Sequence, residues 1–300
     1  MVYEENVTLS VIPPFRLVLT VWALRRRQKN LIDQWNGKQY QRALVVHGNV
    51  VQVIVEQKEE TKLSVTIRSN EEVSGIQGVV KEMLIKILGT EKNLESFYQL
   101  SKMNKHLKLL TEKFRGVKPP RFSTIFEALV NAIACQQITL DLGILLLNRL
   151  SKNYGKQFAD QHAFPRPEDL ADISEKELKS LGFSYQKARA IIELSKALVY
   201  KELSFEDVEI LQNDEVVSLL MAIRGIGRWS AEYVLLRGLG RIDTFPGDDV
   251  GAQKNLMLLL NLPKRPTYDE IKVLTNPWKP YAGFIYFHLL LDKLQKKNLL

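Results

Sequence analysis

Cysteine is nearly absent from this sequence, and metal-ligand patterns are missing as well. The single Cys135 excludes an intramolecular disulfide and any zinc or iron–sulfur site that needs several cysteines. The four histidines are scattered without the spacing of metal ligands. We therefore expect no metal site and no catalytic cofactor.

Long hydrophobic runs are also missing. No stretch approaches the roughly 20 apolar residues that cross a bilayer. The N-terminal segment carries acidic residues where a secretion signal would carry positive charge. With 45% hydrophobic and 25% charged residues, the composition is that of a globular protein. We expect a soluble, cytoplasmic monomer without membrane contact.

The charge balance points to a polyanionic partner. Lysine and arginine number 42 against 34 acidic residues, which gives a formal net charge of +8 and a pI near 9.3. A net positive field attracts phosphate groups. Many basic proteins bind no nucleic acid, so charge alone makes this a weak indication.

The apolar pattern changes period along the chain. Residues 1–70 have strand patterns at 15–27, at 62–69 and in a hairpin over 42–57 that turns at Gly48-Asn49. From 75–90 onward the period is helical. Further helices are predicted at 94–102, 105–112, 122–135, 138–153, 174–181, 184–200, 214–223, 229–237, 249–260, 267–274 and 279–296. The fold class is therefore α+β, with a small β-rich domain over 1–104 and a large all-α domain over 105–300.

A helix-hairpin-helix pattern covers residues 216–237. An apolar helix ends at Ile223, the turn Arg224-Gly225-Ile226-Gly227-Arg228 follows, and a second helix begins near Trp229. Two glycines around one apolar residue allow a tight hairpin, and Ile226 would fill the space between the helices. Backbone N–H groups beside a helix start suit a phosphate, and Arg224 and Arg228 add positive charge. A plain connection between packed helices, with solvated arginines, is the alternative.

An aspartate pair follows the hairpin by about 20 residues. Asp248 and Asp249 lie in the loop 242–255, at the start of a helix. The order of hairpin, helix and aspartate resembles the helix-hairpin-helix–Gly-Pro-Asp superfamily of DNA glycosylases, and within it the alkyl-base branch, DNA-3-methyladenine glycosylase II. The segments that resemble this branch are 122–139, 164–198, 225–238, 245–251 and 276–290.

The resemblance implies an activity and a catalytic residue. It implies a helix-hairpin-helix glycosylase domain that removes alkylated bases from double-stranded DNA and starts base-excision repair. If the source is prokaryotic, we expect association with the nucleoid. Asp249 aligns with the catalytic aspartate, whose carboxylate would stabilise positive charge on the sugar as the base leaves. We expect Asp248 to cap the helix at the edge of the pocket. From the residues alone, both aspartates are equally well explained as caps.

The resemblance also assigns the substrate pocket. Bifunctional members of the superfamily carry a lysine nucleophile where this chain has Trp229, and an indole cannot form a Schiff base. We therefore expect water as nucleophile and no strand cleavage. Trp229 would stack on the extruded base through a cation–π contact, and Tyr233, one turn later, would face the same pocket. A core tryptophan is the alternative for Trp229.

Two positions depart from the alkyl-base pattern. Leu290 stands where the relative has a second pocket tryptophan, which puts the substrate range in doubt. Gln137 stands where the relative has an apolar wedge that fills the space of the flipped base, and Gln136 beside it would form structural hydrogen bonds near the DNA. The resemblance also allows a structural monovalent cation at the hairpin.

Some readings stay open. Arg25-Arg26-Arg27 could touch DNA, although a solvated strand end is the simpler interpretation. A non-catalytic DNA-binding module would use the hairpin alone, and Trp229 and Asp249 count against it. A glycosylase for oxidised or deaminated bases is a second alternative, and the absent lysine disfavours it. The lesion range does not follow from the sequence.

Overall fold

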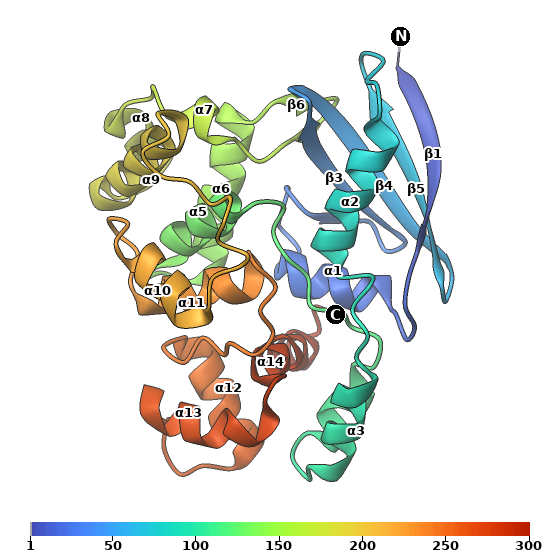
Figure 1. Cartoon of the computed structure of the whole chain (residues 1–300), viewed down its shortest axis with the longest axis vertical. Coiled ribbons are helices and arrows are strands. Elements are labelled where there is room, and N and C mark those ends of the chain that lie inside the picture. The colour runs from blue at the N-terminus through green and yellow to red at the C-terminus, as the bar shows by residue number, and fades with distance from the viewer. Residues whose placement is uncertain (1) are drawn as a thin grey trace.

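The computed structural model describes residues 2–300 of the chain. An antiparallel sheet lies along one side of the molecule, with the spatial order β1-β5-β4-β3-β2 (Figure 1). Its strands are β1 (Tyr3–Ser10), β2 (Gln34–Trp35), β3 (Gln39–Val46), β4 (Asn49–Glu59) and β5 (Lys62–Ser69). Alternation of apolar and polar residues sets the buried face. Leu63, Val65 and Ile67 of β5 are at most 1% exposed.

The β3–β4 hairpin turns at His47 and Gly48. Val46 pairs with Asn49 across the turn, and the two turn residues have φ angles of 48° and 81°. Two positive φ angles are typical of the type I′ turn, whose twist matches that of the strands. The turn was predicted at Gly48-Asn49, which is one residue too late. His47 takes the first left-handed position of the turn and Gly48 takes the second.

Residues 17–25 form a helix, so the strand predicted over 15–27 was wrong. Helix α1 (Leu17–Arg25) is buried along all of its length except Val18. It packs against α14 (Ala282–Lys296) and α2 (Ile76–Leu88). A helix that is apolar on every side shows no helical period. A short apolar run of this kind cannot be told from a buried strand by its pattern.

Most of the chain after residue 75 is helical, which confirms the α+β fold class, although the larger part is mainly rather than entirely helical. The remaining helices are α3 (Glu95–Met103), α4 (Lys108–Lys113), α5 (Ile125–Cys135), α6 (Leu140–Tyr154), α7 (Pro167–Leu170), α8 (Glu175–Ser180), α9 (Tyr185–Val199), α10 (Asn213–Met221), α11 (Arg228–Arg237), α12 (Val250–Leu260) and α13 (Tyr268–Thr275). A two-stranded ribbon, β6 (Gln157–Phe158) and β7 (Gln161–His162), was not predicted. In residues 2–300, no helix has the length and apolar character to span a bilayer.

Side-chain caps explain where several of these helices begin. A serine or threonine hydroxyl accepts a hydrogen bond from the backbone N–H three residues later, which satisfies one of the free donors of the first turn. The helices capped in this way are α5, α6, α8, α9 and α13. Helix α12 is capped instead by an aspartate, Asp249.

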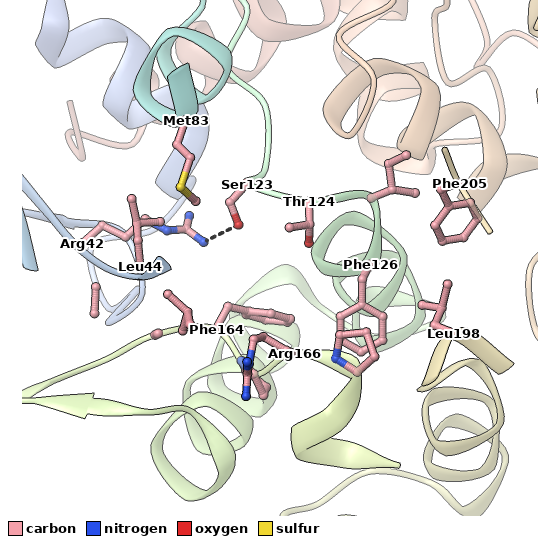
Figure 2. Close-up of a pocket in the computed structure, with 16 residues that line it drawn as sticks. Arg42, Leu44, Met83, Ser123, Thr124, Phe126, Phe164, Arg166, Leu198 and Phe205 are labelled. Carbon is pink, nitrogen blue, oxygen red and sulfur yellow. Dashed lines mark hydrogen bonds between the residues drawn. The ribbon is translucent and has the colours of Figure 1, made fainter. Parts of the chain in front are cut away.

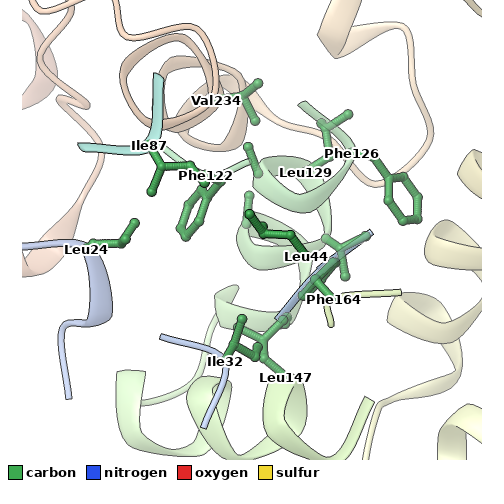
Figure 3. Close-up of a cluster of buried hydrophobic side chains, with 14 of the residues drawn as sticks. Leu24, Ile32, Leu44, Ile87, Phe122, Phe126, Leu129, Leu147, Phe164 and Val234 are labelled. Atoms are coloured by element: carbon green, nitrogen blue, oxygen red, sulfur yellow. The ribbon is translucent and has the colours of Figure 1, made fainter. Parts of the chain in front are cut away.

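A hydrophobic core runs from the sheet into the helices. Figure 3 shows Leu24 of α1 and Leu44 of β3 in one cluster with Leu129 of α5 and Val234 of α11. Helix α11, which carries Trp229 and Tyr233, and α5, which ends just before Gln136, therefore pack on the same core as the sheet.

A buried charge network also ties the sheet to α5. Arg42 of β3 donates to Asp33 at 2.8 Å and to Glu127 of α5 at 2.6 Å, and all three side chains are at most 2% exposed. Tyr40 donates a further hydrogen bond to Asp33 at 2.9 Å. The two carboxylates are buried only because they are paired in this way.

Candidate active site

The hairpin between α10 and α11 has the geometry that the glycines predict. Gly225 has a φ of 81°, and an added Cβ would lie 2.9 Å from the Cβ of Ala190. Both facts require glycine at this position. Ile226 is 5% exposed and packs in the core, as predicted. Gly227 has a φ of −97° and precedes α11 as its N-cap. Only one of the two glycines is therefore needed for its backbone conformation.

The two hairpin arginines are exposed, and each pairs with an acidic side chain. Arg224 lies 3.1 Å from Glu193. Arg228 lies 2.8 Å from Asp248 and 3.7 Å above the ring of Tyr268. Exposed ion pairs contribute little to the free energy of folding. A DNA phosphate could therefore displace the carboxylate of Glu193 or of Asp248 from its arginine. Their predicted DNA contacts remain predictions.

Asp249, and not Asp248, caps α12. Its Oδ1 accepts a hydrogen bond of 2.8 Å from the backbone N–H of Ala252. The assignment of the cap to Asp248 was therefore wrong, because the Asp248 side chain turns to Arg228. Asp248 and Asp249 both lie at the start of a helix, as predicted, and this helix is α12.

Two side chains from other helices hold the second oxygen of Asp249. The indole N–H of Trp229 donates to Oδ2 at 3.3 Å, and the hydroxyl of Tyr286 donates to the same oxygen at 3.1 Å. Burial and the charge of Asp249 raise the pKa of Tyr286 well above its usual value, so the hydroxyl stays protonated and remains a donor. Helices α11, α12 and α14 thus meet at one carboxylate.

A buried glutamate fixes the loop that leads to Asp249. Glu232 of α11 accepts hydrogen bonds from the backbone N–H of Gly247 at 3.1 Å and from the hydroxyl of Tyr268 at 2.6 Å. The side-chain amide of Gln253 donates to the carbonyl of Gly247 at 2.8 Å. Burial raises the pKa of Glu232. A Cβ added to Gly247 would lie 2.7 Å from the Tyr268 ring, so the loop can pack here only with glycine.

Trp229 and Tyr233 lie together, as their spacing predicts. Their ring centroids are 5.5 Å apart at an interplanar angle of 31°. Trp229 is half-buried, whereas Tyr233 is 2% exposed and accepts a hydrogen bond of 2.7 Å from Arg26. Tyr233 is therefore a buried neighbour of Trp229. The interpretation of Arg25-Arg26-Arg27 as a solvated strand end was wrong, since Arg25 and Arg26 are each 4% exposed.

The loop between α5 and α6 reaches the hairpin through Gln136. Its side-chain amide donates to the carbonyl of Gly225 at 2.8 Å and lies 2.9 Å from the Ser230 hydroxyl. Lys187 donates to the carbonyl of Gln136 at 2.7 Å and so holds this loop against α9. Gln137 is exposed and has a φ of 54°. Six other non-glycine residues among the described ones share this region, so the positive φ does not by itself mark a functional position.

Two contacts in the site were missed by the sequence analysis, that of Tyr286 with Asp249 and that of Arg26 with Tyr233. No role was predicted for Tyr286, and Arg26 was placed at a strand end. Leu290, one turn after Tyr286 on α14, is half-buried. Tyr286 could have been found from its i, i+4 spacing to Leu290, the position aligned with the pocket tryptophan. No sequence signal indicates Arg26.

A separate apolar pocket of about 400 Å³ lies between β3, the start of α5 and the segment 163–167. Figure 2 shows Leu44, Phe126, Phe164, Leu198 and Phe205 around it, with Arg42 bonded to Ser123 at its edge. None of the predicted site residues lines it. We therefore place the candidate site at Asp249 and not at this pocket.

The arrangement at Asp249 suits stabilisation of a developing cation. A fixed carboxylate lies beside a half-buried aromatic ring, close to an exposed hairpin, and such a group stabilises positive charge on a reacting sugar. Among residues 2–300, no group of three or more histidine, cysteine or acidic side chains could hold a metal. The absence of a cofactor stays a prediction.

The monovalent cation at the hairpin also stays a prediction. The carbonyl of Ile223 accepts a hydrogen bond from the N–H of Ile226, and the carbonyl of Gly225 accepts one from Gln136. Each carbonyl oxygen has a second lone pair, so these bonds are compatible with a bound cation.

Comparison with known proteins agrees with this geometry. Residues 130–280 match the family model of the HhH-GPD superfamily base excision DNA repair proteins. A DNA-3-methyladenine glycosylase of Bacillus subtilis is 30% identical over 66% of this chain and 67% of its own length.

Two solved structures extend the comparison. A 3-methyladenine DNA-glycosylase of Archaeoglobus fulgidus is similar over 96% of this chain and 97% of its own, with a TM-score of 0.84 at 23% identity. A 3-methyladenine DNA glycosylase of Schizosaccharomyces pombe, solved with abasic DNA, is similar over 65% of this chain and 95% of its own, with a TM-score of 0.58 at 27% identity. From the family match and the Bacillus relative together, this chain belongs to the HhH-GPD superfamily of base excision DNA repair proteins.

Proposed function

We propose that this protein is a monofunctional DNA glycosylase. It flips an alkylated base of the 3-methyladenine type out of double-stranded DNA and hydrolyses the N-glycosidic bond, which starts base-excision repair. The observation that carries the proposal is the Asp249 carboxylate, held by Trp229 and Tyr286 close to an exposed hairpin. The names of the Bacillus and Schizosaccharomyces relatives support the choice of alkylated bases.

The site residues have distinct parts in this reaction. The hairpin over Arg224–Arg228 binds a backbone phosphate, and Gln137 enters the space that the flipped base leaves. Trp229 stacks on the extruded base. Asp249 stabilises the positive charge on the sugar and orients the attacking water. A monomer suffices, because all these residues lie in one chain.

A lyase step is not part of this proposal. A glycosylase that also cleaves the strand needs an amine that attacks the sugar. The position beside the hairpin is Trp229, and its indole N–H is bonded to Asp249. Water is therefore the nucleophile, and the product is an intact strand with an abasic site.

Base release from methylated DNA tests the proposal. The purified protein would be incubated with methylated duplex and with undamaged duplex, and released bases and abasic sites would be measured. We expect methylated bases from the damaged duplex only, with strand breaks appearing only after alkali. Binding without release would favour the DNA-binding module, and breaks before alkali would contradict the monofunctional reaction. Affinity should fall as salt rises, since phosphate contacts release counterions.

A further inference from the structure

A group of cations lies beside the Asp249 carboxylate, outside the hairpin. It consists of one arginine just after α1, one lysine of α12, one of α14 and the lysine that ends α14, and we call it the basic cluster: Arg27, Lys254, Lys293 and Lys297. Helix α14 packs against both α1 and α12 (Figure 1). Packing of these three helices therefore brings together cations from distant parts of the chain.

Lys293 is the member of the basic cluster nearest to the carboxylate. Its side chain is half-buried. A Cβ added to Gly251 would lie 3.8 Å from Lys293 Nζ and 3.1 Å from Asp249 Oδ1, so the ammonium and the carboxylate lie close to the same point at the start of α12. The hairpin helix instead contacts Oδ2 of Asp249, through Trp229. Lys293 is thus a neighbour of the carboxylate that does not depend on the hairpin.

The face of α14 that carries Tyr286 continues into the basic cluster. Tyr286, Leu290, Lys293 and Lys297 follow one another at spacings of four, three and four residues, which place them on one side of a helix. The row begins at the hydroxyl that contacts Asp249 and ends at the exposed C-cap, Lys297. A basic stripe therefore leads away from the carboxylate along α14.

The positive charges of the basic cluster repel one another. Burial lowers the pKa of Lys293, and three neighbouring cations lower it further: Lys297, Arg27 and Lys254. Within residues 2–300 the three lysines form no salt bridge, and Arg27 pairs at 3.0 Å with Asp141, whose side chain is 72% exposed. Like charges at this proximity destabilise a folded chain. A bound anion would relieve that repulsion.

The acidic side chains around the site already have other partners. Four of them bond to groups outside the basic cluster: Asp33 to Arg42 and Tyr40, Asp248 to Arg228, Glu232 to Gly247 and Tyr268, and Asp292 to Lys113 and Lys296. Asp249 faces Lys293, but both of its oxygens accept hydrogen bonds from other groups. The three lysines are therefore available to an anion from outside the chain.

The proposed reaction places phosphates at this position. A nucleotide whose sugar faces Asp249 carries one phosphate on its 5′ side and one on its 3′ side. The nucleotide leaves the duplex by rotation about its backbone, so this backbone must pass close to the carboxylate. Lys293 and Lys297 are about 6 Å apart along the helix axis, and their long side chains can reach neighbouring phosphates of one strand.

We propose that the basic cluster is a second phosphate-binding site, which holds the strand that carries the flipped nucleotide while the hairpin holds a different phosphate. The inference rests on the proposed glycosylase function and adds residues to its DNA interface. Lys293 binds the phosphate nearest to the sugar, and Lys254 and Lys297 bind the backbone beyond it. A phosphate at Lys293 also neutralises a cation that would oppose the positive charge on the sugar.

Binding to a duplex with an abasic-site analogue tests the inference without chemistry. The duplex carries a tetrahydrofuran residue in place of the damaged nucleotide, and its affinity is measured over a range of salt. Each phosphate contact releases counterions, so Lys293→Gln and Lys297→Gln should each lower the slope of log affinity against log salt by about 1. Lys293→Arg, which keeps the charge, should leave the slope as in wild type.

Two lysines far from the basic cluster serve as controls. Lys86→Gln on α2 and Lys152→Gln on α6 remove the same charge from exposed positions, and they should leave the slope unchanged. If the cluster variants and the controls have the same slope as wild type, the inference is wrong. Should Lys293→Gln not fold, the exposed Lys297→Gln gives the same test.

Neutral phosphates locate the contact. A methylphosphonate, which carries no charge, would replace the phosphates on both sides of the abasic analogue one at a time. We expect one replacement to weaken binding of wild type about tenfold and to leave binding of Lys293→Gln nearly unchanged, because that variant has already lost the contact. Arg224→Gln should become insensitive at a different phosphate. An equal response of wild type and Lys293→Gln at every position would overturn the inference.

Failure of the inference can be told from failure of the proposed function. If wild type releases methylated bases but the cluster variants bind the abasic duplex as wild type does, only the second phosphate site is wrong. If wild type releases no base and binds the abasic duplex no better than undamaged duplex, the glycosylase function is wrong, and the inference falls with it.

Discussion

At the residue scale, the two oxygens of Asp249 make different contacts. Oδ1 accepts the backbone N–H of Ala252 and caps α12, whereas Oδ2 accepts bonds from Trp229 and Tyr286. Asparagine is as good an N-cap as aspartate. Asp249→Asn therefore removes the charge with little effect on the helix, which makes it the appropriate variant for tests of chemistry.

Tyr286 should position the carboxylate. Tyr286→Phe removes one of the two donors to Oδ2, and a hydrogen bond to a charged group contributes about 1.5–3 kcal/mol. We expect the single-turnover rate of base release to fall about tenfold or more, with a small change in the melting temperature. Tyr200→Phe, at an exposed tyrosine on the surface, is the control. An unchanged rate in Tyr286→Phe would show that Trp229 alone holds the carboxylate.

Gln137 should matter only when a base has to leave a duplex. Gln137→Ala shortens the exposed side chain at the α5–α6 loop. We expect slower release from duplex DNA and an unchanged rate from single-stranded DNA of the same sequence, because a single strand needs no wedge. Gln137→Gly separates strain from function, since glycine accepts the φ of 54° without cost. Equal losses on both substrates would refute the wedge assignment.

The sequence predicts the site residues that lie within local motifs and misses those brought in from elsewhere. Asp249 and Trp229 belong to one ordered motif, and the structure joins them directly. Tyr286 reaches Asp249 from 37 positions away, and Arg26 reaches Tyr233 from 207. Contacts at such separations depend on the packing of whole helices, which no local pattern specifies.

At the scale of elements, the connection between the sheet and α5 depends on a buried charge network. Arg42→Met would leave Asp33 and Glu127 buried without their partner. Removal of one member of a buried ion pair costs about 3–5 kcal/mol, and we expect a loss of that size in urea unfolding. Arg68→Met, which breaks an exposed pair with Glu4, should cost less than about 1 kcal/mol. Similar losses in the two variants would contradict this account.

Helix α1 is the one element that was predicted as the wrong type, and it shows where hydrophobic periodicity fails to predict secondary structure. The helix over 75–90 was predicted correctly because its apolar residues occupy one face of the helix. Helix α1 is buried on nearly every side, so it has no solvent-facing side that would give its sequence a helical period. β-branched residues in α1 favour a strand by propensity, and tertiary packing overrides such a preference. Its position against α14 follows from the fold of the whole chain.

At the scale of the whole molecule, one buried histidine should make stability depend on pH. His288 lies among Phe97 and Phe284, and burial lowers its pKa to about 4. In the unfolded chain its pKa is near 6.5. On acidification the unfolded state binds a proton that the folded state refuses. The stability that the neutral histidine provides is present above pH 6.5 and is lost as the pH falls towards 4, by at most about 3 kcal/mol.

Urea unfolding at pH 7.5 and pH 4.5 checks this dependence. His288→Gln should lose less free energy of unfolding between the two pH values than wild type does. His47→Asn, in the exposed β3–β4 turn, should behave as wild type. If His288→Gln loses as much as wild type, other groups cause the acid sensitivity.

The most direct test of the account compares single-turnover base release from methylated duplex DNA by wild type, Asp249→Asn and Asp248→Asn, at matched folding and DNA affinity. Asp248 pairs with Arg228 on the surface, whereas Asp249 contacts Trp229 and Tyr286. We predict that Asp249→Asn lowers the rate at least about 100-fold and that Asp248→Asn changes it by less than about tenfold. A nearly normal rate in Asp249→Asn, or a greater loss in Asp248→Asn, would contradict the central claim.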